Sequence, residues 1–183
     1  MRAPTAGGTM LIRPVLPTDA ERICEIYNHY VTKTIVTFEE RPVTADEMRA
    51  RIDAVADKFP WLVLERDGGI AGYAYAAPWK ARIGYRFSVE SSIYFAPEYV
   101  GHGFGSVLYG ALLRALPPLG IQCVIGGAAL PNPGSVALHE KLGFSKVAHF
   151  RRVGRKFDRW IDVGYWQLML QGFGGDAAIA GAG

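Results

Sequence analysis

Apolar side chains recur every three or four residues in two segments near the N-terminus, and this spacing predicts two amphipathic helices. The apolar face of the first helix consists of Ile23, Ile26, Tyr27 and Tyr30. Thr18 and Glu21 precede it with the spacing of a capping box, in which two side chains bind free amides at a helix start. Thr44 and Glu47 repeat that arrangement, so we expect a second helix that begins there and ends before Pro60.

Beyond Pro60 the pattern changes to short apolar or alternating runs, which predict strands. Residues 61–65 form the first run, the turn residues 67–69 follow, and residues 70–76 are expected to pair back as a hairpin. The segment 87–95 alternates between two faces. Its more polar face carries Ser88, Glu90, Ser92 and Tyr94.

The C-terminal half alternates helices and strands, with proline and glycine at the boundaries. The predicted order is a helix after the loop 96–102, a strand at 123–125, a helix at 134–142, and strands at 146–153 and 160–170. A mixed α/β sheet with helices on both faces accommodates this order. The join between the strand 87–95 and the next helix is short and rich in glycine, so we expect a ligand there.

Composition places the chain among ordinary folded proteins. The 183 residues, 50% of them hydrophobic and 20% charged, suit a single domain, which we expect at residues 11–170. Residues 1–10 are predicted to be a flexible N-terminus, and residues 171–183, almost wholly Gly and Ala, a disordered tail. No apolar run reaches the roughly 18 residues that a membrane span needs.

The formal net charge of +3 is too small to indicate a nucleic-acid-binding protein, and it suits a small anionic ligand. Basic and aromatic residues do alternate near the C-terminus, where they are expected to form a solvated hairpin or a dimer edge rather than a nucleic-acid site. These residues are Phe150, Arg151, Arg152, Arg155, Lys156, Phe157, Arg159 and Trp160. Cys24 and Cys123 have no metal-binding spacing, so no metal site is expected. They are interpreted as buried reduced thiols of a cytoplasmic protein, with a disulfide as the alternative.

The glycine-rich segment 101–106 follows a predicted strand and opens a predicted helix. Glycine lets the backbone approach a ligand closely, and the free N–H groups of a helix start form a site for a pyrophosphate. The sixth position is Ser106, so the segment is not a dinucleotide-binding Gly-x-Gly-x-x-Gly, and it lacks the lysine of a Walker A loop. The alternative is a turn whose glycines serve packing.

The segments 101–106 and 132–144 together resemble the two signature segments of GNAT acyl-CoA N-acyltransferases. Four further motifs resemble the phosphinothricin acetyltransferase subfamily: Asn28-His29-Tyr30, Tyr73 to Arg82, Val89 to Tyr94, and Asp162 to Gln167. The likeness extends from about Ile12 to Leu168. It implies acetyl-CoA as the donor, a small amino-acid-like amine as the acceptor, a homodimer, and a mostly antiparallel sheet that splays at the cofactor site.

The family pattern is broken at Val100, which stands where Arg or Gln is usual and offers no side-chain donor. The backbone amides of the loop must then hold the pyrophosphate. The expected cofactor-binding loop residues are Gly101, His102, Gly103, Phe104, Gly105 and Ser106.

Acetyl transfer to an amine requires that the ammonium first lose a proton, and a carboxylate can accept it. Glu90 is the candidate base because it lies on a polar strand face beside the glycine loop, although a lone strand glutamate can simply face solvent. As the amine attacks, the thioester carbonyl gains negative charge, which backbone N–H groups can stabilise. By resemblance, the residues that supply these N–H groups and hold the pantetheine arm are Ile93, Tyr94 and Phe95.

Three further residues are candidates for proton return and cofactor binding. His139 occupies the place of the tyrosine acid of many GNAT enzymes, and its alternative is a histidine on the helix surface. Tyr109 is a second candidate proton donor or a packing tyrosine. Asn132 is expected to bind the pantetheine amide, with an ordinary helix cap as the alternative.

By resemblance, the acceptor site is expected at Lys80, Arg82 and Phe38, and the alternative for Lys80 and Arg82 is two solvated charges. A forked guanidinium suits a carboxylate or phosphinyl oxygen, so Arg82 is favoured for that contact. Phe38 is expected to wall the pocket or to pack in the core.

The sequence thus predicts an acetyl-CoA-dependent N-acetyltransferase of phosphinothricin- or methionine sulfoximine/sulfone-like amino acids. The alternatives are acetylation of a protein N-terminus or a polyamine, and an acyl-CoA sensor without turnover.

Overall fold

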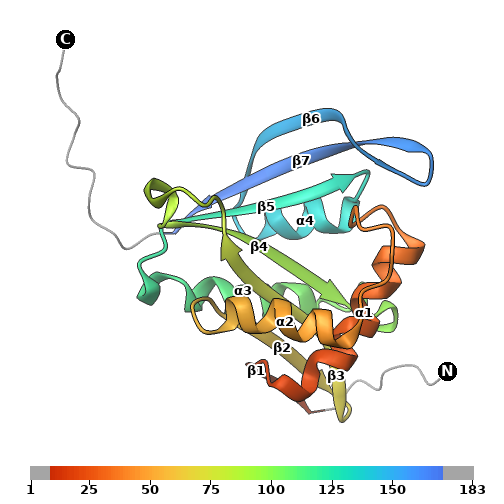
Figure 1. The fold of residues 1–183 in the computed structure, drawn as a ribbon. Coiled ribbons are helices and arrows are strands. Elements are labelled where there is room, and N and C mark those ends of the chain that lie inside the picture. Colours follow the sequence, from red (N-terminus) through yellow and green to blue (C-terminus); the bar gives the residue numbers. More distant parts are fainter. Residues whose placement is uncertain (1–8, 171–183) are drawn as a thin grey trace.

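One seven-stranded sheet organises the computed structural model, which describes residues 9–170 (Figure 1). The strands are β1 (Met10–Pro14), β2 (Trp61–Arg66), β3 (Gly69–Pro78), β4 (Ser88–Phe95), β5 (Cys123–Leu130), β6 (Ser145–Lys156) and β7 (Arg159–Met169). Their order across the sheet is β1-β2-β3-β4-β5-β7-β6. Neighbours are antiparallel except β4 and β5, which are parallel. The expected α/β class, with a mixed and mostly antiparallel sheet, is confirmed.

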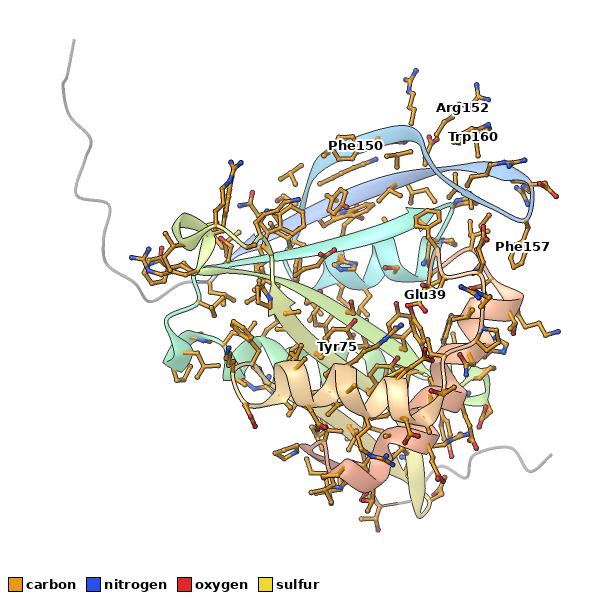
Figure 2. The ribbon with its side chains drawn as sticks, in the orientation of Figure 1. Glu39, Tyr75, Phe150, Arg152, Phe157 and Trp160 are labelled. Carbon is orange, nitrogen blue, oxygen red and sulfur yellow. The ribbon has the colours of Figure 1, made fainter. Side chains whose placement is uncertain are left out.

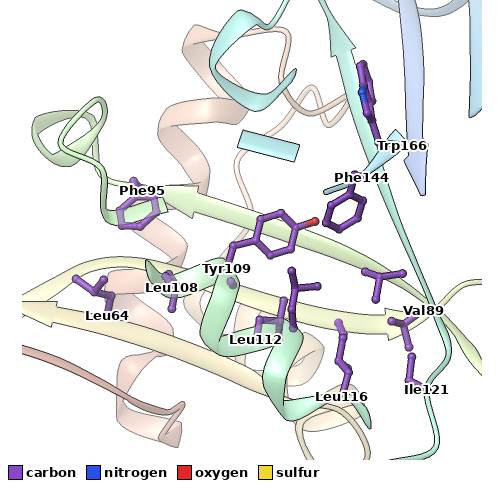
Figure 3. Packing of buried hydrophobic residues seen from close by; sticks show 14 of the residues in the cluster. Leu64, Val89, Phe95, Leu108, Tyr109, Leu112, Leu116, Ile121, Phe144 and Trp166 are labelled. Carbon is purple, nitrogen blue, oxygen red and sulfur yellow. The ribbon is translucent and has the colours of Figure 1, made fainter. Parts of the chain in front are cut away.

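Four α-helices cover the two faces of the sheet: α1 (Ala20–Lys33), α2 (Ala45–Ala56), α3 (Phe104–Ala115) and α4 (Pro133–Lys141) (Figure 1). Residues of β2 and β3 divide between two buried clusters, one on each face of the sheet. One cluster joins α1 and α2 to the sheet through residues such as Ile23, Val63 and Tyr73. The other lies against α3 and contains Val89, Leu112 and Trp166 among its members (Figure 3).

The sheet opens between β4 and β5. The two strands pair only from Ser88 to Ser91 on β4 and from Cys123 to Gly126 on β5. Beyond that point β4 stays paired with β3 as far as Phe95, and β5 stays paired with β7 as far as Leu130. The strands therefore diverge, as Figure 1 shows, and the expected splay of the sheet is present.

Helix starts show one confirmed prediction and one wrong one. Thr44 accepts a bond from the Glu47 amide and Glu47 accepts one from the Thr44 amide, so the second capping box is formed. Thr18 does not cap α1. Thr18 lies inside the 3₁₀ turn Pro17–Asp19 that leads into α1, and the Asp19 carboxylate of this turn accepts a hydrogen bond from the Leu16 amide and pairs with Arg13 of β1.

Two expectations fall on the chain ends. The predicted Gly/Ala tail, residues 171–183, and most of the predicted flexible N-terminus, residues 1–10, lie outside the described residues. Within residues 9–170, no helix is long and apolar enough to span a membrane.

Candidate active site

The glycine loop brings the backbone of α3 to the opening of the sheet. Gly101 and Gly103 have φ values of +84° and +81°, a left-handed conformation that favours glycine. Gly103 is the residue before α3, so the first amides of the helix have no helical acceptor. These N–H groups and the positive end of the helix dipole form a site that suits a phosphate group.

A cavity of about 460 Å³, here called the donor cavity, lies where β4 and β5 separate. Nine of the ten expected cofactor residues line it: Ile93, Tyr94, Phe95, Gly101, Gly103, Phe104, Gly105, Ser106 and Asn132. The tenth, His102, does not; it is exposed and its ring stacks on Phe104, with centroids 6.1 Å apart. Gly101 and Gly103, which flank His102, are both left-handed, and this backbone conformation turns the His102 side chain away from the cavity.

Asn132 lies between β5 and α4, at the N-cap position of α4. Its Oδ1 accepts a hydrogen bond from the Ser135 amide at 3.1 Å, so the residue is a helix cap. It also lines the donor cavity. The two interpretations of Asn132 are therefore compatible.

Glu90 lies half-buried beside the opening of the sheet. A Cβ built on Gly127, which lines the donor cavity, would lie 3.4 Å from Glu90 Oε1. Burial raises the pKa of the Glu90 carboxyl, and the charge of Lys80 opposes that rise. Glu90 is thus a carboxylate with a strengthened affinity for a proton.

His139 is buried, with only 3% of its surface exposed, so the interpretation as a helix-surface histidine is wrong. The reason is that α4 packs its inner face onto β5, where a Cβ at Gly126 would overlap the imidazole. His139 Nδ1 lies 2.7 Å from the Ser135 carbonyl oxygen, which can only accept, so Nδ1 carries the proton. Burial lowers the pKa of His139 and keeps the ring neutral.

The second nitrogen of His139 continues a chain of buried polar groups. His139 Nε2 lies 3.2 Å from the Tyr109 hydroxyl, which lies 2.6 Å from Ser91 Oγ. Tyr109 is fully buried, and burial raises its pKa well above its ordinary value. Ser91 and His139 line the donor cavity, whereas Tyr109 connects them from behind. Ser91 was not predicted from the sequence, because its contact with the Tyr109 hydroxyl of α3 exists only in the folded chain.

The three candidate catalytic residues divide between the two faces of β4. Tyr94 packs on Tyr27 and Tyr30 of α1, so its strand neighbour Glu90 faces the α1–α2 side. Ser91, one position further along, contacts Tyr109 of α3 on the opposite side. Ser91 lines the donor cavity, whereas Glu90 is not among its lining residues and lies on the opposite face of β4, next to Gly127.

A second cavity of about 740 Å³, here called the acceptor cavity, lies on the Glu90 side of the sheet. Of the three expected acceptor residues, Phe38 and Lys80 line it, but Arg82 does not and is exposed. Arg155, which was expected only as a solvated hairpin residue, lines the cavity together with Lys80. Arg82 begins a short 3₁₀ helix, Ile83–Tyr85, that carries the chain away from the sheet.

Aromatic rings form much of the wall of the acceptor cavity. The Tyr165 ring contacts Trp79 and Phe150 edge to face, with centroids 5.7 Å apart in both pairs. Lys80 Nζ lies 4.6 Å from the centroid of the Trp79 ring. The cavity therefore combines apolar walls with two cations.

These features are those of a group-transfer enzyme. The donor site, which suits a phosphate group, lies where β4 and β5 separate, and the acceptor cavity lies next to it. A model of the acetyltransferase (GNAT) domain matches residues 12–164. The chain is 41% identical over 156 residues to phosphinothricin N-acetyltransferase of Streptomyces viridochromogenes, and the match covers 85% of each protein. It is 36% identical over 162 residues to the L-methionine sulfoximine/L-methionine sulfone acetyltransferase of Salmonella typhimurium, covering 88% of this chain and 95% of that protein.

A solved structure agrees with these matches. A GNAT superfamily phosphinothricin acetyltransferase from Sinorhizobium meliloti, in complex with AcCoA, superimposes with a TM-score of 0.85 at 35% identity. The superposition covers 88% of this chain and 89% of that chain. The chain belongs to the GNAT acetyltransferase family. It is an N-acetyltransferase that uses acetyl-CoA, and its glycine loop and donor cavity fit that cosubstrate.

Proposed function

We propose that this enzyme acetylates the amino group of phosphinothricin- or methionine sulfoximine/sulfone-like amino acids, with Glu90 as the general base. The observation that carries the proposal is the position of Glu90 between the two cavities. Its carboxylate lies against Gly127 of the donor cavity and within electrostatic reach of Lys80 of the acceptor cavity. The names of the two relatives above support the choice of acceptor.

The acetyl-CoA thioester supplies the acyl group, and the residues of this chain manage two protons and one developing charge. Glu90 takes the proton that the acceptor ammonium must lose before its nitrogen can bond to the acyl carbon. The backbone N–H groups of Ile93–Phe95 on the free edge of β4 stabilise the negative charge that develops on the carbonyl oxygen. As the carbon–sulfur bond breaks, the sulfur takes up a proton.

We place His139, Tyr109 and Ser91 in the return of that proton. Neutral His139 fixes the Tyr109 hydroxyl through Nε2, and Ser91 connects this hydroxyl to the wall of the donor cavity. Direct donation by an imidazolium is disfavoured because burial lowers the pKa of His139.

The acceptor cavity supports an amino acid with an acidic group. Lys80 and Arg155 supply positive charge for a carboxylate or a phosphinyl or sulfonyl oxygen. Phe38, Trp79 and Tyr165 supply apolar surface for the rest of the molecule. Two cations in the wall argue against a polyamine as the acceptor.

We further propose a homodimer in the cytoplasm. Support for the dimer comes from the exposed apolar residues of β6 and β7 discussed below. Support for a reducing compartment comes from Cys24 and Cys123, which are both buried and free.

The test is release of free thiol from acetyl-CoA over a panel of acceptors. We expect turnover with phosphinothricin, methionine sulfoximine and methionine sulfone, and little with spermidine or with a peptide that has a free N-terminus. If only the polyamine or the peptide were acetylated, the proposed amino-acid acceptor would be wrong. Calorimetric binding of CoA without turnover for any amine would instead indicate a sensor.

A further inference from the structure

Lys156 is a charged residue that the catalytic scheme does not use, although it is almost completely buried. It ends β6, and only 2% of its surface is exposed. Its Nζ donates to the Thr37 carbonyl oxygen at 2.7 Å and lies 3.4 Å from the Tyr30 carbonyl oxygen. The Phe157 ring lies 5.1 Å from Nζ. The expectation of a solvated hairpin lysine is therefore wrong, because its partners belong to a loop distant in the sequence.

That loop, residues 34–44 between α1 and α2, contributes to both cavities. Val36 lines the donor cavity and Phe38 lines the acceptor cavity. Thr37, whose carbonyl binds Lys156, stands between them in the chain. Lys156 thus binds Thr37, whose two neighbours in the chain line different cavities.

The other side of the loop is held from α1 and α2. The Glu39 carboxylate accepts bonds from Arg51 at 2.6 Å and 3.1 Å and from the Tyr27 hydroxyl at 2.9 Å. Tyr27 and Thr37 also share a hydrogen bond of 2.8 Å between their hydroxyls. Only Lys156 connects the loop to the β6–β7 hairpin among the side-chain hydrogen bonds found within residues 9–170. Figure 2 places Phe157, at the hairpin tip, on the same side of the molecule as Glu39.

The hairpin and the loop also meet at the acceptor cavity itself. The Phe38 ring packs so closely on Gly154 that a Cβ at Gly154 would overlap it. Gly154 lies two residues before Lys156, and Arg155 lines the same cavity. Lys156 therefore joins the two segments at the place where they form one wall.

Burying an ammonium is costly unless its hydrogen bonds are satisfied, and lysine is among the residues least often buried. A lysine that served only to keep the hairpin in solution would leave its charge in water, as the exposed Lys146 of the same strand does. The burial of Lys156 instead fixes a loop and a hairpin relative to each other.

We propose that Lys156 is a positioning residue for the acceptor site: by binding the Thr37 carbonyl it holds Phe38 against the β6–β7 hairpin and so sets the shape of the acceptor cavity. This inference rests on the proposed function for the identity of the acceptor. It does not assign Lys156 any contact with a reacting atom.

The test compares Lys156→Met with Lys146→Met. Methionine keeps an unbranched side chain but loses the donor, whereas Lys146 lines neither cavity. We expect Lys156→Met to lower kcat/KM for the acceptor roughly tenfold or more, mainly through KM, since small misplacements at a binding site have effects of this order. The KM for acetyl-CoA is expected to stay within about twofold, because Val36 is the one residue of loop 34–44 that lines the donor cavity, whereas the glycine loop supplies five of its lining residues. Lys156→Gln, whose amide can still donate, is expected to fall between Lys156→Met and the wild type.

A second readout does not depend on turnover. Amide hydrogen exchange of residues 34–44 is expected to become faster in Lys156→Met and to remain unchanged in Lys146→Met. If the wild type acetylates no acceptor, the proposed function fails while the exchange experiment still tests the positioning role. Unchanged exchange together with an unchanged acceptor KM in Lys156→Met would overturn the inference. An equal loss of kcat/KM for the acceptor and for acetyl-CoA, accompanied by a general loss of stability, would also overturn it. If Lys156→Met does not fold, the same comparison is made with Lys156→Gln.

Discussion

At the scale of single residues, the chemistry depends on where burial places each ionisable group. Burial raises the pKa of Glu90 and so its proton affinity, and the charge of Lys80, which lines the acceptor cavity, opposes that rise. His139 loses proton affinity for the same physical reason, since burial disfavours the charged form of either group. The carboxylate is therefore tuned to accept a proton, and the imidazole is tuned to stay neutral.

Glu90→Gln should remove the base and leave the donor site intact. We expect kcat to fall by about 10²–10⁴, the usual range for a lost general base, with the affinity for CoA little changed. The wild-type rate should fall as the pH drops through the raised pKa of Glu90, because the protonated carboxyl cannot accept a proton. The measurement is the pH profile of kcat/KM for both proteins.

The matched control is Glu98→Gln, an exposed glutamate whose partner is Arg22. It should keep the wild-type profile. If Glu90→Gln retained both the wild-type rate and the wild-type acidic limb, Glu90 would be removed from the mechanism.

At the scale of elements, the contact between α4 and β5 leaves no room for a side chain at Gly126. A Cβ there would overlap the His139 ring, while φ at this glycine is not in the left-handed region. We expect Gly126→Ala to destabilise the protein by about 1–3 kcal/mol, the range for an overpacked core, and to displace the imidazole. Thermal unfolding measures the first effect and steady-state kinetics the second.

Gly69→Ala is the control for this substitution, since nothing lies within 4 Å of the Cβ position at Gly69. Its stability should change by no more than about 1 kcal/mol. Equal stabilities for Gly126→Ala and the wild type would mean that α4 is free to move away from β5.

Asn132 allows the cap of α4 to be separated from a contact with the cosubstrate. Asn132→Ala should lower stability by about 1 kcal/mol, because it removes the acceptor for the Ser135 amide. Asn132→Asp keeps that acceptor and removes the amide donor, so its stability should be near that of the wild type. If Asn132 binds the pantetheine arm, both variants weaken CoA binding in calorimetry. Normal CoA affinity in Asn132→Asp would mean that Asn132 caps α4 and does not bind the pantetheine arm.

Elements were predictable where the signal is local. The hairpin turn at residues 67–69 and the glycine loop before α3 both carry their dihedral requirements in the sequence, and both form as expected. Partners from distant segments are not encoded in any short window. Lys156 was therefore expected in a solvated hairpin or at a dimer edge, although it binds the distant Thr37.

At the scale of the whole molecule, the donor site was easier to predict than the acceptor site. The donor cavity draws most of its predicted lining from β4 and the loop that follows it. The acceptor cavity draws on four separate segments, represented by Phe38, Lys80, Arg155 and Tyr165. Only the fold brings these together, which is why Arg155 was not among the expected acceptor residues.

The edge of the sheet formed by β6, with its partner β7, carries an unusual amount of exposed apolar surface (Figure 2). Its large exposed apolar residues are Val147, Phe150, Val153, Phe157, Trp160 and Met169, of which the first three also line the acceptor cavity. Exposed apolar side chains on an edge strand favour association, and a symmetric dimer uses the same patch on both subunits. The proposed homodimer is therefore expected to form through this hairpin.

Trp160→Glu should weaken that association. Trp160 is 56% exposed and lines neither cavity, so a charge at this position opposes burial in an interface without altering the donor or acceptor residues. Sedimentation velocity over a range of concentrations should show the wild type as a dimer and the variant shifted toward monomer. Leu119→Glu, which places the same charge on a residue 51% exposed outside the hairpin, should sediment as the wild type does. A monomeric wild type, or a variant that dimerises equally well, would contradict an interface on β6 and β7.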